Sequence, residues 1–137
     1  MEAVCARLAC ERMTDEELEE LKRVHEASRS NIGNGEKPGW AESNRAFHMI
    51  LYDGCRNSFL KSQLVSLRPR TAGYLTQAYR SIGRAQESFK QHEELLQALI
   101  ARDADAAVRM MSQHISLAAG AKGLSELLIR MPESMLA

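Results

Sequence analysis

Aromatic residues, proline and glycine are all scarce in this chain of 137 residues. Phenylalanine, tryptophan and tyrosine together make up 5% of the chain, which contains 8 glycines and 3 prolines. No stretch alternates Val, Ile, Thr or Tyr with polar residues over the length of a strand, so nothing indicates a sheet. Ala, Leu, Met, Glu, Gln and Arg, which are good helix formers, dominate instead. We therefore predict an all-α fold.

The chain also lacks a surplus of charge and a long apolar run. Its 18 basic and 18 acidic residues give a formal net charge of +0 at pH 7, whereas affinity for duplex nucleic acid depends on a basic surplus. No apolar run approaches the ~18 to 20 residues of a membrane span, and no secretory signal is recognisable. The sequence therefore argues against a membrane protein and against a chain that binds DNA by itself.

Cysteine is rare as well, with only Cys5, Cys10 and Cys55. An odd number of cysteines at wide spacing is typical of reduced, buried thiols rather than of a disulfide framework. We therefore expect a reducing, cytoplasmic compartment. The length suffices for one domain with its own core, and we predict a single domain over residues 1–137.

Caps, loop residues and apolar periodicity divide the chain into about six to seven helices. Thr14 and Glu17 form a capping-box pattern, Asn57 or Ser58 can cap a later helix, and Asp103 another. Pro69 predicts a kink in the fourth helix. We expect helices over residues 2–12, 14–28, 40–52, 59–81, 85–101, 103–118 and 124–131.

Three of the four histidines fall on the apolar faces of expected helices. His48 follows Asn44 by one turn on the third helix, His92 lies on the apolar stripe of the fifth, and His114 lies on that of the sixth. At ~1.5 Å per residue, His92 and His114 each stand about 15 to 17 Å from the turn that joins their helices. The sequence therefore predicts that three imidazoles point into one core, two of them at the same level.

This arrangement favours a metal site over hydrogen-bonded core histidines. Neutral imidazoles suit zinc, nickel, cobalt, manganese or iron, and the side-chain carbonyl of Asn44 can add a fourth donor. We predict one divalent ion, with zinc expected and nickel, manganese or iron as alternatives. His25 lies among Lys22, Arg23 and Glu26 in the sequence and is expected on the surface.

Charge is distributed unevenly along the chain. Residues 54–86 contain six bases and no acid, whereas residues 11–27 contain seven acids and three bases. Either the two stretches are solvated faces that attract each other, or the basic helix faces an anionic small molecule. On the second interpretation Arg70, or next Arg68, binds a small carboxylate through paired hydrogen bonds, and Tyr74 donates its hydroxyl to the same effector.

Four motifs in order resemble a known family. They are N-x-x-F-H ending at His48, H-x-x-[LI]-x-x-A-[LI] from His92, R-D-A-x-A-A from Arg102 and H-I at His114. Together with the opening ARLACERMTDEELEEL, they are similar to the FCD domain, the ligand-binding C-terminal domain of the FadR branch of GntR-type bacterial transcription regulators. The resemblance covers about residues 2–118.

The resemblance implies an antiparallel helical bundle that dimerises and binds a small effector, often an organic acid. It also implies control of an N-terminal winged helix-turn-helix that binds operator DNA. Carried over, the family's metal ligands are Asn44, His48, His92 and His114. The family pattern commonly has Asp where this chain has Asn44, and an amide is a neutral, weaker ligand.

No winged helix-turn-helix precedes Met1, so we expect a fragment of a longer regulator rather than a stand-alone domain. We also expect a homodimer that contacts DNA only through the missing N-terminal domain.

Two other function classes stay open. A di-iron enzyme would need Glu three residues before its histidines, whereas this chain has Lys22, Arg45, Phe89 and Met111 there; we expect no catalytic activity. A ligand-free structural dimerisation module would instead use the histidines as hydrogen-bonded core residues. Thermal denaturation with and without a chelator separates this module from an effector-binding domain.

Overall fold

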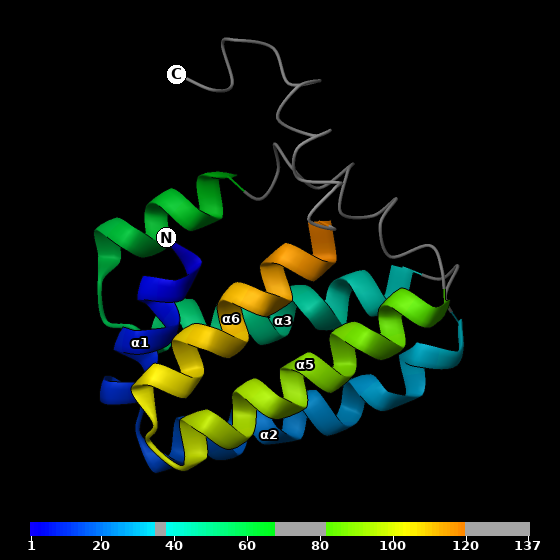
Figure 1. Cartoon of the computed structure of the whole chain (residues 1–137), viewed down its shortest axis with the longest axis horizontal. Helices are drawn as coiled ribbons and strands as arrows, with labels where there is room; N and C mark the ends of the chain where they lie inside the picture. The colour runs from blue at the N-terminus through cyan, green and yellow to red at the C-terminus, as the bar shows by residue number, and fades with distance from the viewer. Residues whose placement is uncertain (35–37, 68–81, 120–137) are drawn as a thin grey trace, which may run out of the picture.

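The computed structural model describes residues 1–34, 38–67 and 82–119, in which helices are joined by short turns (Figure 1). The described elements are α1 (Glu2–Arg12), α2 (Asp15–Ser28), the 3-10 helix η1 (Arg29–Asn34), α3 (Pro38–Gly54), a helical segment at 58–67, α5 (Ile82–Ile100) and α6 (Ala104–Ala119). These residues include no strand, so the predicted all-α class is confirmed. Within the same residues, no helix combines the length and the apolar character needed to cross a membrane.

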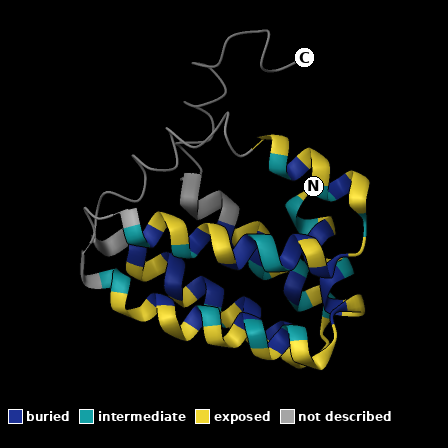
Figure 2. Ribbon diagram, turned by 180° about the vertical axis from the view of Figure 1, so that it is seen from behind, coloured by how far each residue is buried: buried dark blue, intermediate teal, exposed yellow. Residues whose placement is uncertain are grey.

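Five helices pack around the main core cluster of the described residues. α1 packs against α6 and α3, α2 packs against α3 and α5, and α5 packs against α6, so the contacts close into a ring. Figure 2 shows that buried residues lie on the inner faces of these helices and exposed residues on the outer faces. The bundle thus brings side chains from α3, α5 and α6 into the same interior.

Side-chain caps begin several helices where the sequence predicts them. The Thr14 hydroxyl accepts a hydrogen bond from the Glu17 N–H at 3.2 Å. Of the two candidates before the segment 58–67, Asn57 is the cap, since its Oδ1 accepts from the Leu60 N–H at 3.0 Å. Each such cap stabilises a helix by about 1 kcal/mol because it satisfies an otherwise unpaired N–H.

The turn between α5 and α6 sets the register of these two helices. The Asp103 N–H donates to the Ala98 carbonyl at 3.0 Å, the Arg102 N–H donates to the Leu99 carbonyl at 3.1 Å, and Arg102 has a φ of 56°. This pair of bonds closes a helix end through one left-handed residue. Asp103 then caps α6 by accepting from the Ala106 N–H at 3.1 Å. The chain therefore reverses within a few residues, and α6 returns antiparallel along α5.

The helix bounds agree with the prediction to within three residues for α1, α2, α3, α5 and α6. The predicted kink at Pro69 and the predicted helix over 124–131 lie outside the described residues.

All three cysteines are free and buried, as the sequence predicts. Burial raises the pKa of the Cys5 thiol, with a further contribution from neighbouring Cys55, and burial also raises the pKa of the Cys10 thiol. Thiols held protonated in this way behave as small apolar core groups rather than as nucleophiles.

Gly54 closes the end of α3 against Met13, and this contact leaves no room for a side chain. A Cβ at Gly54 would collide with Met13 Cγ and lie 2.9 Å from Met13 Sδ. Met13 is itself buried at 2% exposure, so its side chain must be displaced within a packed core to make room. We therefore expect Gly54→Ala to lower the free energy of unfolding by about 1–3 kcal/mol, as measured by urea denaturation.

The control is the same substitution in a Met13→Ala background, where the new methyl group enters vacated space. There Gly54→Ala should cost less than it does beside Met13. An equal cost in the two backgrounds would show that steric conflict with Met13 is not the cause.

Candidate metal centre

Three histidines from three helices meet in the interior of the bundle. His48 comes from α3, His92 from α5 and His114 from α6, and all three are buried. His114 Nε2 lies 3.3 Å from His48 Nε2 and 3.2 Å from His92 Nε2. The candidate ligand nitrogens of all three lie within 4.8 Å of one another. The structure thus brings together the three imidazoles that apolar periodicity places on inner helix faces.

These separations fit a metal ion. Zinc bonds imidazole nitrogen at about 2.0–2.1 Å, so two nitrogens on one tetrahedral ion lie about 3.3 Å apart. The two Nε2–Nε2 distances measured from His114 agree with that spacing. The donor set also suits zinc or a neighbouring transition metal, because neutral imidazole is a common ligand for these ions.

The protonation of His114 is arranged for coordination through Nε2. Its Nδ1 lies 2.8 Å from Gln91 Oε1, and Gln91 Nε2 in turn donates to Glu87 Oε1 at 3.3 Å. The second bond orients the Gln91 amide so that its oxygen faces the imidazole. His114 then donates from Nδ1, which leaves the Nε2 lone pair directed at the other histidines.

Aromatic side chains hold the His92 ring in place. Phe47 stacks on it with ring centroids 4.1 Å apart and an interplanar angle of 2°, and Trp40 lies at 6.0 Å with an angle of 22°. Phe47 also meets His48 edge-on at 6.0 Å. Two of the three imidazoles therefore contact the same buried ring, which limits their rotation.

Asn44, the predicted fourth donor, is buried on α3 one turn before His48. Its Oδ1 atom is shielded from solvent and has no hydrogen-bond partner in the part of the chain that the structure describes. A buried amide oxygen left without a partner costs about 1–3 kcal/mol. A metal ion bound in the adjacent histidine cluster is one way to satisfy this oxygen. Asn44 and the three histidines therefore fit a divalent metal ion.

The prediction that His25 lies on the surface is wrong. His25 is fully buried, stacks on Phe89 at 4.2 Å between ring centroids, and pairs through Nε2 with Glu93 Oε2 at 2.6 Å. Burial lowers the pKa of His25 below its ordinary value, while the Glu93 carboxylate acts in the opposite direction. His25 thus joins α2 to α5 next to the three-histidine cluster.

The sequence neighbours of His25 are charged, whereas its position on the helix lies on the buried face. Residues next to one another in sequence point in different directions on a helix. The informative spacing runs through the buried positions of α2, which are Leu18, Leu21, His25 and Ser28.

The three predicted effector contacts Arg68, Arg70 and Tyr74 lie outside the described residues. Within the described part of the basic stretch 54–86, Arg56 forms an ion pair with Glu17 of the acidic stretch 11–27. This one ion pair is of the kind that the interpretation as mutually attracting faces predicts.

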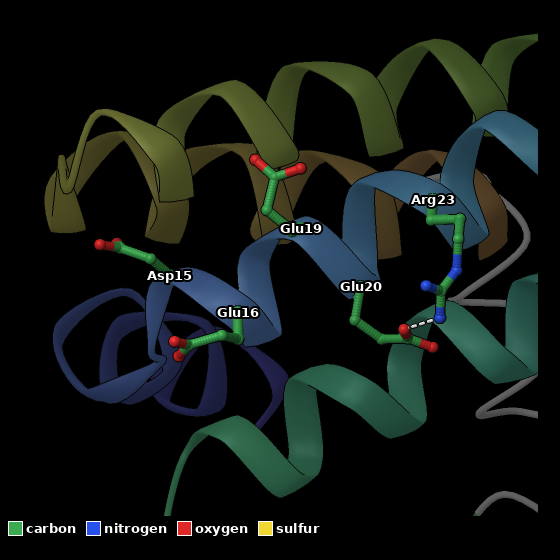
Figure 3. Close-up of a pocket in the computed structure, with 5 residues that line it drawn as sticks. All are labelled: Asp15, Glu16, Glu19, Glu20 and Arg23. Carbon is green, nitrogen blue, oxygen red and sulfur yellow. Dashed lines mark hydrogen bonds and ion pairs between the residues drawn. The ribbon is translucent and has the colours of Figure 1, made fainter.

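A surface hollow on α2 is unrelated to the histidine cluster. It is lined by Asp15, Glu16, Glu19, Glu20 and Arg23, all from one helix. Figure 3 shows that these side chains fan out rather than converge, and that Glu20 pairs with Arg23. This arrangement is a solvated helix face and not a binding site.

Sequence reasoning missed three residues around the cluster: Glu2, Tyr52 and Gln91. The Tyr52 hydroxyl donates to Glu2 Oε1 at 2.5 Å, and Glu2 Oε2 lies 3.8 Å from His48 Nδ1. Tyr52 follows His48 by one turn, so helical spacing was a usable signal for it. Nothing in the sequence near Glu2 indicates the contact, because it depends on how α1 packs against α3.

Comparison with known proteins gives one family and one fold. The FCD domain family matches residues 1–117. Among solved structures, Escherichia coli McbR/YncC is similar with a TM-score of 0.73 and 24% sequence identity over 85% of this chain. The chain spans 58% of the length of that structure. No curated protein sequence matches this chain significantly.

Proposed function

Because the chain belongs to the FCD domain family, we propose that it is the effector-sensing domain of a GntR-type transcription regulator and that it holds one divalent metal ion. The ligands are His48, His92 and His114, with Asn44 as a weaker fourth donor. Zinc is the expected ion, with nickel, manganese or iron as alternatives.

The convergence of three buried imidazole nitrogens carries this proposal. The three Nε2 atoms converge on the same small volume, and Gln91 favours the His114 tautomer that leaves a lone pair on Nε2. Two lone pairs that face each other at hydrogen-bond distance repel unless a proton or a cation lies between them. A bound metal would satisfy the three nitrogens together and would anchor an anionic ligand as a Lewis acid.

The proposed effector is a small carboxylate that binds at this metal. Three imidazoles and an amide are all neutral, so an anion that completes the coordination gains both a bond and charge neutralisation. Arg70, Arg68 and Tyr74 are proposed to contact it. Thermal shift of zinc-loaded protein with mono- and dicarboxylates, sugar acids and neutral sugars tests this effector class. Stabilisation by neutral compounds alone, or unchanged carboxylate affinity in Arg70→Ala, would contradict it.

Membership of the family supports a proposal for the regulatory setting of the domain. We propose that the domain acts as a homodimer in the cytoplasm, has no catalytic activity, and controls a winged helix-turn-helix through which a longer regulator binds DNA. Light scattering at ~10 to 100 μM tests the first point. A species of 15.3 kDa throughout this range would contradict a dimer of this chain.

Metal content is the decisive experiment for the proposed function. Elemental analysis of undialysed protein should find about one equivalent of a transition metal, and His92→Gln should lose it. Leu99→Ala is the control, because it removes a fully buried side chain from the same helix as His92 but no member of a group that could hold an ion. Less than about a tenth of an equivalent, even after incubation with zinc, would sink the metal proposal and favour a ligand-free dimerisation module.

A further inference from the structure

The first helix places a carboxylate behind one of the proposed metal ligands. Glu2, at the start of α1, has its Oε2 atom 3.8 Å from His48 Nδ1 and shielded from solvent. The other oxygen of the same carboxylate accepts a hydrogen bond from the Tyr52 hydroxyl at 2.5 Å. Tyr52 is fixed in turn, since it is buried at 1% exposure one turn after His48 on α3. The carboxylate is therefore held against the back of the His48 ring.

This placement has a consequence for His48. A carboxylate facing Nδ1 favours the tautomer that carries its proton there, which leaves the lone pair on Nε2. His48 Nε2 is the atom that meets His114 Nε2 at 3.3 Å. Gln91 accepts a hydrogen bond from His114 at 2.8 Å, whereas Glu2 acts on His48 across 3.8 Å through its negative charge.

The charge matters because the proposed donors themselves carry none. His48, His92, His114 and Asn44 are all neutral, so a divalent ion among them would keep both of its positive charges. Among the described residues, Glu2 lies within ion-pair distance of one of these four donors. It faces Nδ1 of His48, the ring nitrogen that points away from the cluster.

We propose that Glu2 is a positioning residue for the metal centre. It orients His48 and, from the Nδ1 side of that ring, supplies the negative charge that the neutral donors lack. This inference rests on the proposed metal site. It links α1 energetically to the ion, since the carboxylate that compensates the metal belongs to that helix. One positive charge of a divalent ion remains, which still leaves the site attractive to a carboxylate effector.

The test is zinc affinity, measured by competition with a chromophoric chelator. Glu2→Gln keeps the size of the side chain and an oxygen that can accept from Tyr52, and it removes only the charge. It should weaken zinc binding about 10–100-fold, the range typical of lost partners behind metal ligands. Glu11→Gln, which removes an exposed carboxylate from the same helix, should stay within about twofold because solvent screens that charge.

A second background separates charge from packing. Asn44→Asp puts a negative charge directly among the donors and halves the net charge of the centre, which also halves its attraction to Glu2. Glu2→Gln should therefore cost only about 3–10-fold in the Asn44→Asp background, the square root of its cost in the native chain. Without zinc, the Glu2→Gln and Glu11→Gln variants should melt at the same temperature, because neither change removes buried apolar contacts.

Three results would overturn the inference. The first is a change in zinc affinity of less than about twofold in Glu2→Gln, and the second is an equal loss of zinc affinity in Glu11→Gln. The third is an equal loss of zinc affinity on Glu2→Gln in the native chain and in the Asn44→Asp background. Each of these leaves zinc bound by the three histidines and so leaves the proposed function standing. Absence of zinc binding in the native chain would instead overturn both.

Discussion

Replacing Phe47 with alanine is expected to lower the free energy of unfolding by about 3–5 kcal/mol and to weaken zinc binding at the same time. Phe47 is 1% exposed and lies in the main core cluster, so its removal leaves a cavity that close-packed neighbours fill only in part. It also stacks face to face on His92 at 4.1 Å and meets His48 edge-on. Loss of this ring frees two proposed ligands to rotate.

Urea denaturation measures the first effect and chelator competition the second. Leu99→Ala is the matched control, because Leu99 is fully buried in the same cluster on α5, two turns beyond His92. It should lose about 2–5 kcal/mol of stability and keep the zinc affinity of the native chain. If both variants lost the same zinc affinity, the effect would reflect general loosening of the bundle rather than the contacts of Phe47.

The helices of this chain were predictable because their signals are local. Thr14, Asn57 and Asp103 cap the helices that they were expected to cap, and each acts on an N–H only a few residues away. Apolar periodicity placed His48, His92 and His114 on inner faces for the same reason. The matched positions of His92 and His114 along their helices were also predictable, because one short turn fixes the register of the two antiparallel helices.

The surroundings of the cluster were not predictable in the same way. Glu2 reaches His48 across 46 positions of sequence, and only the packing of α1 against α3 brings them together. No periodicity within either helix encodes that approach. A residue whose role depends on two helices at once becomes visible only in the assembled bundle.

His25 is an intermediate case. Its spacing from Leu18 and Leu21 marks an inner face, but its immediate neighbours are charged and suggest a solvated position. The helix period decides such conflicts, because it reports the direction of a side chain and the adjacent residues do not. What the period cannot supply is the partner, Glu93 on α5, which makes burial of this imidazole tolerable.

Zinc is expected to raise the stability of the folded chain strongly. A ligand that binds only the native state adds about 2.7 kcal/mol when its free concentration is 100 times its dissociation constant. For a domain of this size that corresponds to an increase in Tm of about 10 °C. The effect should be large here because the three proposed ligands come from α3, α5 and α6, so the ion would hold three helices together.

Differential scanning calorimetry with zinc, with magnesium and with a chelator measures this stabilisation. Magnesium should leave Tm unchanged, because it prefers oxygen ligands and the cluster presents imidazole nitrogens. His114→Gln should abolish the zinc-dependent increase, since His114 Nε2 is the atom that contacts both of the other ligands. An equal increase with His114→Gln would show that zinc binds elsewhere. No increase with zinc in the native chain would favour buried histidines that stabilise the bundle as hydrogen-bonded core residues.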